Sequence, residues 1–262
     1  MGLEQLARPV WSALTTRWSP LAEGDARAWR LGRDYGVFGA AVDRSPDSLA
    51  ALAVLVPEEG ELWTVERDDW PAPPGTRYLR RAECVQMVCS ELTPAAPPRF
   101  EIVDLAESDA PAMYDLAILT QPGPYAAHTN RLGAFIGVKE DGRLVAMAGE
   151  RMKMPGLSEV SGVCTHPDHR GRGYAGALMR VVAERMIARG ETPWLHAYAS
   201  NAGAIALYES LGFRHHAVSI ASVLVRPEFV MPDLIRHPCP GRASIDIDLG
   251  PVQDVDPGSR PG

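Results

Sequence analysis

The stretch that most limits the fold of this chain lies in its second half. Residues 157–165 read as a largely apolar strand, and Pro167 places a turn directly after it. Gly171 and Gly173 follow, and residues 174–189 then carry apolar side chains at helical spacing. The sequence therefore predicts a strand, a glycine-containing loop and a helix in direct succession.

The loop has the features of an anion-binding site. Two glycines before a helix let several backbone N–H groups approach one anion, and the helix dipole favours negative charge there. Arg170 and Arg172 add positive charge. The loop is not a P-loop, because no Lys-Ser/Thr pair follows the second glycine, and it lacks the Gly-x-Gly-x-x-Gly pattern of dinucleotide-binding folds. It is suited to binding a pyrophosphate.

Residues 163–175 resemble motif A of the GNAT superfamily of N-acetyltransferases. Residues 170–175 read Arg-x-x-Gly-x-Ala, and the family signature is Gln/Arg-x-x-Gly-x-Gly/Ala. The resemblance implies that acetyl-coenzyme A is the co-substrate and that the loop binds its pyrophosphate, mainly through backbone groups. It also implies that the end of the preceding strand polarises the thioester carbonyl and pairs with the pantetheine arm, with Gly162 permitting a bulge. The cofactor-binding residues expected here are Val163, Cys164, Thr165, Arg170, Gly171, Arg172, Gly173, Tyr174 and Ala175.

A second motif follows in residues 201–213, which read Asn-x-x-Ala-x-x-Leu-Tyr-x-x-Leu-Gly-Phe. It resembles motif B of the same superfamily, in which the Asn begins a helix and contacts the pantetheine arm. Tyr208 lies two turns after Asn201, on the same helical face. A phenol with a pKa of ~10 is a competent proton donor to a departing thiolate. We therefore expect Tyr208 to bind the cofactor and act as the general acid, and core packing is the alternative.

The general base is less well marked. Glu159 lies on the predicted strand in phase with Val163, so we expect it to accept the proton of the amine or to bind its ammonium group. Glu150 on the preceding strand is the alternative. The imidazoles could also titrate near neutrality: His166, His169 and His196. For the acceptor amine, the resemblance implicates the segment after the first helix, and the candidate contacts are Tyr125, His128 and Glu150.

The order of elements supports the same family. From residue 100 the chain predicts β-α-(α)-β-β-β-α-β-α-β, with a helix capped by Ser108 and a hairpin at Asp141-Gly142. The resemblance implies an α/β (α+β) GNAT acyl-CoA N-acyltransferase fold, with a mixed central sheet flanked by helices. The match covers residues 100–226, about half the chain.

The remainder of the chain divides into three parts. Residues 1–92 predict a second, smaller α/β domain, which we interpret as a degenerate GNAT-like copy; its expected strands include residues 84–92. Residues 93–99 hold three prolines and predict a stiff linker. Residues 227–262 are rich in Pro and Gly and predict a flexible tail.

Composition excludes several other classes of protein. The 262 residues carry a net charge of −7, which disfavours a general nucleic-acid-binding surface. The four cysteines show no metal-type spacing, and Pro167 between His166 and His169 disfavours a metal site there. No run approaches the ~18 apolar residues that a membrane span needs. We expect a cytoplasmic protein without a metal, either a monomer or a homodimer.

The function these patterns favour is transfer of an acetyl group from acetyl-CoA to a primary amine by direct attack. The acceptor is a small molecule or a peptide. A non-catalytic, acyl-CoA-binding regulatory module is the alternative from another class. A scaffold whose N-terminal part binds a protein partner is a third.

Overall fold

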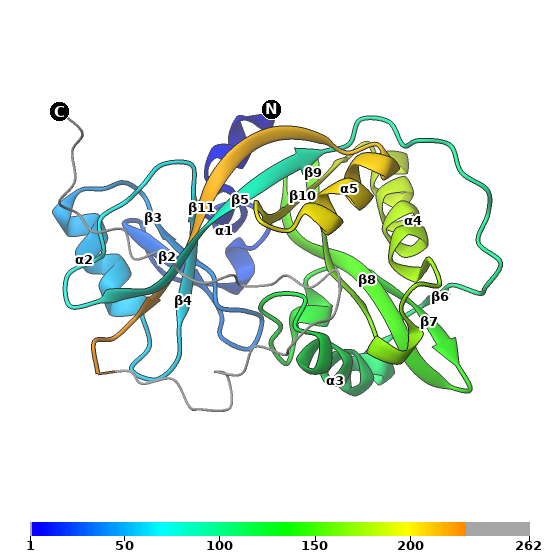
Figure 1. Ribbon diagram of the computed structural model, residues 1–262. Coiled ribbons are helices and arrows are strands. Elements are labelled where there is room, and N and C mark those ends of the chain that lie inside the picture. Colours follow the sequence, from blue (N-terminus) through cyan, green and yellow to red (C-terminus); the bar gives the residue numbers. More distant parts are fainter. Residues whose placement is uncertain (1, 229–262) are drawn as a thin grey trace.

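The computed structural model describes residues 2–228, shown in Figure 1. The predicted tail therefore lies almost wholly outside the described residues. The helices are α1 (Pro9–Leu14), α2 (Pro46–Leu55), α3 (Ala110–Thr120), α4 (Tyr174–Ala188) and α5 (Ala202–Leu211). The strands are β1 (Ala22–Asp25), β2 (Ala28–Leu31), β3 (Gly39–Ala41), β4 (Leu62–Glu66), β5 (Arg77–Val88), β6 (Val103–Asp104), β7 (Phe135–Glu140), β8 (Arg143–Met154), β9 (Leu157–Thr165), β10 (Thr192–Tyr198) and β11 (Arg214–Val225). Short 3₁₀ helices are η1 (Leu3–Ala7), η2 (Ser19–Leu21), η3 (Glu107–Asp109), η4 (Thr129–Arg131) and η5 (Pro167–His169).

A single large sheet organises the fold. Its eight strands run in the order β4-β11-β5-β10-β9-β8-β7-β6. The pairing of β9 with β10 is parallel, and the other pairings in this sheet are antiparallel. A mixed central sheet, which the resemblance implied, is therefore confirmed. The parallel pair lies in the middle of the sheet.

Helices cover both faces of this sheet. On one face α4 and α5 pack against the strands, and Leu178, Val182 and Met186 of α4 are fully or almost fully buried. On the other face α1 and η1 bury Leu6, Val10 and Leu14. Helix α3 packs on this second face further along, over β8 and β9. The sheet thus separates the hydrophobic core under α4 and α5 from the one under α1 and η1.

The N-terminal part is joined to the large sheet. The smaller unit is present as the sheet β1-β2-β3 with α2 packed on it. However, β4 and β5 belong to the large sheet, and β5 lies between β10 and β11. A bridge between Phe38 and Trp63 connects the small unit to the β4 edge. The large sheet contains strands from both sides of residues 93–99. The division into domains at these residues, and the interpretation of residues 1–92 as a degenerate copy, therefore stay predictions.

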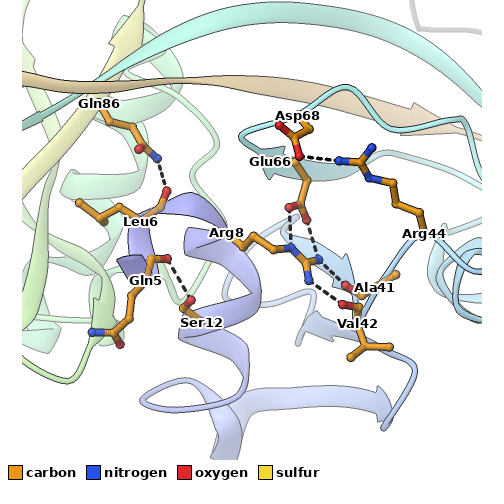
Figure 2. Close-up of polar contacts among 10 residues, drawn as sticks. All are labelled: Gln5, Leu6, Arg8, Ser12, Ala41, Val42, Arg44, Glu66, Asp68 and Gln86. Atoms are coloured by element: carbon orange, nitrogen blue, oxygen red, sulfur yellow. Dashed lines mark hydrogen bonds and ion pairs between the residues drawn. The ribbon is translucent and has the colours of Figure 1, made fainter. Parts of the chain in front are cut away.

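A buried ion pair holds the N-terminal helices against this junction (Figure 2). Arg8 donates two hydrogen bonds to the Glu66 carboxylate, of 2.7 and 3.0 Å, and further ones to the carbonyls of Ala41 and Val42. The side chain of Gln86 on β5 donates to the Leu6 carbonyl at 2.9 Å. These contacts tie η1 and α1 to β3, β4 and β5.

Local sequence signals explain several element ends. Asp141 and Gly142 have φ values of 49° and 77°, which two-residue hairpin turns of type I′ require, and they join β7 to β8 as predicted. The Asn201 side chain accepts from the Ala204 N–H at 3.1 Å and caps α5. The expected cap of α3 is wrong. Ser108 lies inside η3, and Asp109 occupies the N-cap position because the helix begins at Ala110.

Candidate active site

The parallel strands β9 and β10 separate soon after they meet. They pair only through residues 157–159 and 192–194. Beyond Glu159, β9 continues to Thr165 while β10 pairs with β5 on its other side. Within the described chain, the β9 edge facing this gap therefore carries backbone N–H and C=O groups without a ladder partner. Such an edge can accept an extended ligand as if it were a strand.

A bulge lies in β9 next to the gap. The register with β8 shifts between the pairs Met147–Cys164 and Gly149–Ser161, which leaves an extra residue on β9. Gly162 has a φ of +62°, and a Cβ there would lie 2.8 Å from the Phe135 ring. Only glycine meets both conditions without strain. The bulge expected at Gly162 is confirmed, and it redirects the main chain at Val163.

A pocket of about 720 Å³, counted with the open space at its mouth, occupies the gap. Residues of both cores line it, so it passes from one face of the sheet to the other between β9 and β10. The lining on the α4–α5 side includes Val160, Met179, Leu195, Ala197 and Tyr208. The lining on the α1 side includes Phe38, Trp63, Val65, Cys84, Tyr198 and Ala221.

The glycine loop has the backbone that an anion cradle needs. Gly171 and Gly173 have φ values of 77° and 78°, and a Cβ at either position would meet no atom within 4 Å. The first hydrogen bond of α4 joins the Ala177 N–H to the Gly173 carbonyl. The N–H groups from Gly173 to Gly176 therefore point out of the helix end, where the dipole favours an anion. The loop fits a pyrophosphate through its main chain.

The side chains of this loop are engaged elsewhere. Glu140 on β7 lies 2.9 Å from the Arg172 guanidinium and 3.1 Å from the His169 ring, and it accepts from the Tyr174 hydroxyl. The hydrogen bond from Tyr174, together with Arg172 and His169, lowers the pKa of Glu140. Arg170 reaches back toward the Thr165 carbonyl at 3.4 Å. These contacts engage the side chains of the loop with other protein groups.

Tyr208 reaches the pocket from α5. Its side chain is buried, and burial raises the pKa of the phenol to about 12. The phenol therefore keeps its proton throughout the physiological range. Asn201 lies two turns before Tyr208 and uses its side-chain oxygen to cap α5. The structure thus places the predicted acid at the gap and gives Asn201 a structural contact of its own.

Glu159 also lines the pocket, but its environment differs from that of a free base. It is 1% exposed, and its two oxygens each lie 3.0 Å from guanidinium nitrogens of Arg151. Burial raises the pKa of this carboxyl, but Arg151 and His196 outweigh it and lower the pKa to about 2. So weak a base accepts a proton from an amine poorly at neutral pH. The geometry therefore argues against direct proton abstraction by Glu159.

The three predicted acceptor contacts do not line this pocket. Glu150 is 2% exposed, and its carboxylate pairs with Lys153 at 2.5 Å and with Arg189 at 2.8 Å. Tyr125 packs edge-on against Phe135. The His128 ring lies against Tyr35 in the same edge-on way. The segment in which the acceptor contacts were expected lines the pocket just before Tyr125, at residues 122–124.

The sequence analysis missed the contribution of the N-terminal part. Phe38, Trp63, Val65 and Cys84 form the far wall of the pocket. No local signal around Trp63 and Val65 indicates which other strands this strand meets. Among residues 2–228 no three His, Cys, Asp or Glu side chains are placed to bind a metal ion. No helix in that range is long and apolar enough to cross a bilayer.

Comparison with known proteins agrees with this geometry. Residues 135–222 match the model of the FR47-like protein family. A crystal structure of a putative acetyltransferase from the GNAT family of Novosphingobium aromaticivorans is 48% identical, covers 85% of this chain and 99% of its own, and superposes with a TM-score of 0.80. The chain belongs to the GNAT superfamily of N-acetyltransferases. It is thus an enzyme of the acyltransferase class.

Two further GNAT relatives define how far the likeness extends. The ribosomal protein bS18-alanine N-acetyltransferase of Escherichia coli K12 is 29% identical over 123 residues, which is 45% of this chain and 82% of that protein. A GCN5-related N-acetyltransferase from Kribbella flavida is 18% identical, covers 83% of this chain and 94% of its own, and has a TM-score of 0.58. The second likeness concerns the fold alone, and it extends into the N-terminal part of this GNAT protein.

Proposed function

We propose that this GNAT protein transfers an acetyl group from acetyl-CoA to a primary amine, by direct attack of the amine on the thioester. The single observation that supports this best is the pocket between the separated strands β9 and β10. Part of its lining comes from the α4–α5 side of the sheet, where the glycine loop begins α4, and part from the α1 side. Two substrates can therefore approach one point from opposite faces of the sheet.

The cofactor half is supported by main-chain geometry. The N–H groups of residues 173–176 would hold the pyrophosphate, and the free edge of β9 after Glu159 would pair with the pantetheine arm. The bulge at Gly162 turns main-chain groups near Val163 toward the gap, where an N–H can polarise the thioester carbonyl. These groups are fixed before the substrate binds, so little reorganisation accompanies the reaction.

Tyr208 is the proposed acid. When the C–S bond breaks, the departing CoA thiolate takes the phenolic proton of Tyr208. The raised pKa of about 12 means that the phenol remains protonated and ready for each cycle at neutral pH. This pKa lies above the ~8.5 of a free thiol, so Tyr208 keeps its proton until negative charge develops on the sulfur and draws the proton across.

Direct attack is favoured over an acetylated cysteine. Burial raises the pKa of the Cys84 thiol, which lines the pocket, and of the Cys164 thiol, each to about 12. The nucleophilic form of cysteine is the thiolate, so neither thiol is activated. The amine itself is then the nucleophile.

The first test measures acetyl-CoA binding and CoA thiol release across a panel of primary amines. Wild type should bind acetyl-CoA and release thiol only when an acceptor amine is present. Gly173→Val should weaken acetyl-CoA binding at least tenfold, because the side chain is strained at a φ of 78° and projects into the cradle. Gly142→Val is the matched control, since Gly142 has a φ of 77° and equally open space but lies in the β7–β8 turn.

Two results would decide against the proposal. Equal acetyl-CoA affinity in the Gly173 and Gly142 variants would remove the cradle from the binding site. Tight acetyl-CoA binding with no thiol release for any amine would favour the regulatory module over the enzyme.

For the acid, Tyr208→Phe should lower kcat by roughly 100-fold with little change in acetyl-CoA affinity.

A further inference from the structure

The pocket contains a histidine and a carboxylate in contact. His196 on β10 and Glu159 on β9 lie on neighbouring strands, at the point where the strands begin to separate. Nδ1 of His196 is 2.9 Å from Oε1 of Glu159. Within the described residues Nδ1 makes no well-aligned hydrogen bond, as is common for catalytic groups before substrate binds. Both side chains line the α1 side of the pocket, from which the acceptor would approach.

Glu159 is fixed as an anion. Its two oxygens accept from Nε and Nη2 of Arg151, each at 3.0 Å, and Oε2 also accepts from the Met152 N–H at 3.2 Å. Arg151 is itself held with its guanidinium carbon 5.0 Å from the centre of the Phe38 ring. A carboxylate held in this way is well placed to orient an imidazole and to stabilise the imidazolium that forms when it takes a proton.

The other groups around the imidazole are uncharged. Burial raises the pKa of the Cys84 thiol to about 12 and raises the pKa of the Tyr198 phenol above its usual range. Gln86 lies opposite His196 on β5, and its amide donates to a backbone carbonyl of η1. Among the described residues that line the pocket, the charged neighbours of His196 are thus Arg151 and Glu159, and Glu159 is the one in contact with the imidazole.

We infer that His196 is the general base that takes the proton of the acceptor amine, and that Glu159 and Arg151 are positioning residues for its ring. This inference rests on the proposed acetyl transfer. It replaces the direct role of Glu159 expected from sequence. It follows from the contact between His196 Nδ1 and Glu159 Oε1, from the two hydrogen bonds of Arg151 to Glu159, and from the position of the imidazole in the wall of the pocket.

The step balances as follows. The amine nitrogen forms a bond to the thioester carbonyl carbon, and one N–H proton passes to Nε2 of His196, since Nδ1 faces Glu159. The C–S bond then breaks, and the sulfur takes the proton of Tyr208. The products are an amide and CoA thiol. The imidazolium releases its proton to solvent, and Tyr208 takes up a proton from solvent. Each cycle therefore leaves the enzyme unchanged.

The first experiment substitutes the imidazole. His196→Gln should reduce kcat/KM for the best amine roughly 100- to 10,000-fold and leave the acetyl-CoA Kd unchanged. His215→Gln is the matched control, because His215 is exposed on β11, outside the pocket, and should keep the wild-type rate. In His196→Ala, added imidazole should restore part of the lost rate in proportion to its concentration, which repair of a packing defect would not do.

The second experiment tests the positioning role. In Glu159→Gln the imidazolium loses its paired carboxylate, so the acidic limb of the pH–rate profile should move to lower pH. A purely structural role would lower the rate at all pH values and leave the limb in place. If the single variant folds poorly, Arg151→Met/Glu159→Gln removes both buried charges. Because Glu159 is the one in contact with the imidazole, the limb should still move to lower pH, but by less than in the single variant.

The outcomes separate the two proposals. If wild type turns over an amine and His196→Gln keeps more than half of its rate, the base assignment is overturned while acetyl transfer stands. A His196→Ala variant that imidazole does not rescue at any concentration would also overturn it. If wild type binds acetyl-CoA but turns over no amine, acetyl transfer fails, and the base assignment fails with it.

Discussion

Arg8→Met tests how much the buried ion pair in Figure 2 contributes to stability. Arg8 makes two hydrogen bonds to Glu66, whose side chain is 6% exposed, and its guanidinium lies 4.6 Å from the centre of the Trp70 ring. Met fills the space of the aliphatic stem but leaves a carboxylate buried without a partner. The pair also connects α1 to β4, so its loss weakens the attachment of the N-terminal helices.

The magnitude follows from the burial of the two groups. Removing one partner of a buried pair costs about 3–5 kcal/mol, and the lower end applies because 26% of the Arg8 side chain is exposed. At about 2–4 °C per kcal/mol for a chain of this size, Tm should fall by roughly 6–12 °C.

The loss should depend on pH with a defined sign. Burial already raises the pKa of Glu66 above 4.5 in the folded protein, although Arg8 opposes it, and the variant loses that opposition. A raised folded pKa contributes stability below the unfolded value that is lost as pH rises through the folded value. The deficit of Arg8→Met should therefore be largest near neutral pH and shrink as the pH falls toward about 4.5.

Thermal unfolding followed by circular dichroism, at several pH values, checks this prediction. Arg44→Met is the matched control, because it breaks an exposed ion pair with Asp68. The Arg44 side chain is 47% exposed and that of Asp68 is 67% exposed, so the loss should cost about 1 kcal/mol or less. Arg8→Met/Glu66→Gln should recover most of the loss. If Arg8→Met lowers Tm no more than Arg44→Met, or if its deficit grows at low pH, the reasoning is refuted.

Three further predictions concern the pocket. Gly162→Ala should lower stability by about 1–3 kcal/mol and reduce kcat, because its φ of +62° and the Phe135 ring both exclude a Cβ; urea unfolding and thiol release measure the two effects. Trp63→Ala should raise the KM of the amine several-fold at unchanged acetyl-CoA affinity, since Trp63 lines only the α1 side of the pocket; equal losses for both substrates would contradict this. Cys84 should be alkylated far more slowly at pH 8 in the folded than in the unfolded protein, as its pKa of about 12 leaves little thiolate; peptide mass spectrometry measures the rates.

The parts of the fold that sequence predicted best are those governed by local chemistry. The turn at Asp141-Gly142, the cap at Asn201 and the run 157–165 follow from backbone preferences within a few residues, and each is confirmed. Where local preferences conflict with pairing to a distant strand, the predicted boundaries of the element differ from the observed ones. Strand β5 begins at Arg77, seven residues before the predicted start, because its polar first half is paired on β11 despite its charges.

The site divides in the same way. The glycine loop and Tyr208 were predictable because their motifs are contiguous in sequence. The contact of His196 with Glu159 and the wall formed by Phe38 and Trp63 depend on which strands become neighbours. Those neighbours are separated by up to about half the chain, and periodicity along one strand carries no information about its partner.

The position of β11 has a consequence for how the protein is made. Among the strands of residues 2–228 it is the last to leave the ribosome, yet it lies between β4 and β5 and pairs with both. Until residues 214–225 emerge, β4 and the β5 edge facing it lack their partner, and long-range pairings of this kind form slowly. The nascent chain therefore exposes two unfinished strand edges for most of its synthesis, so chaperone dependence during translation should be strongest in this region.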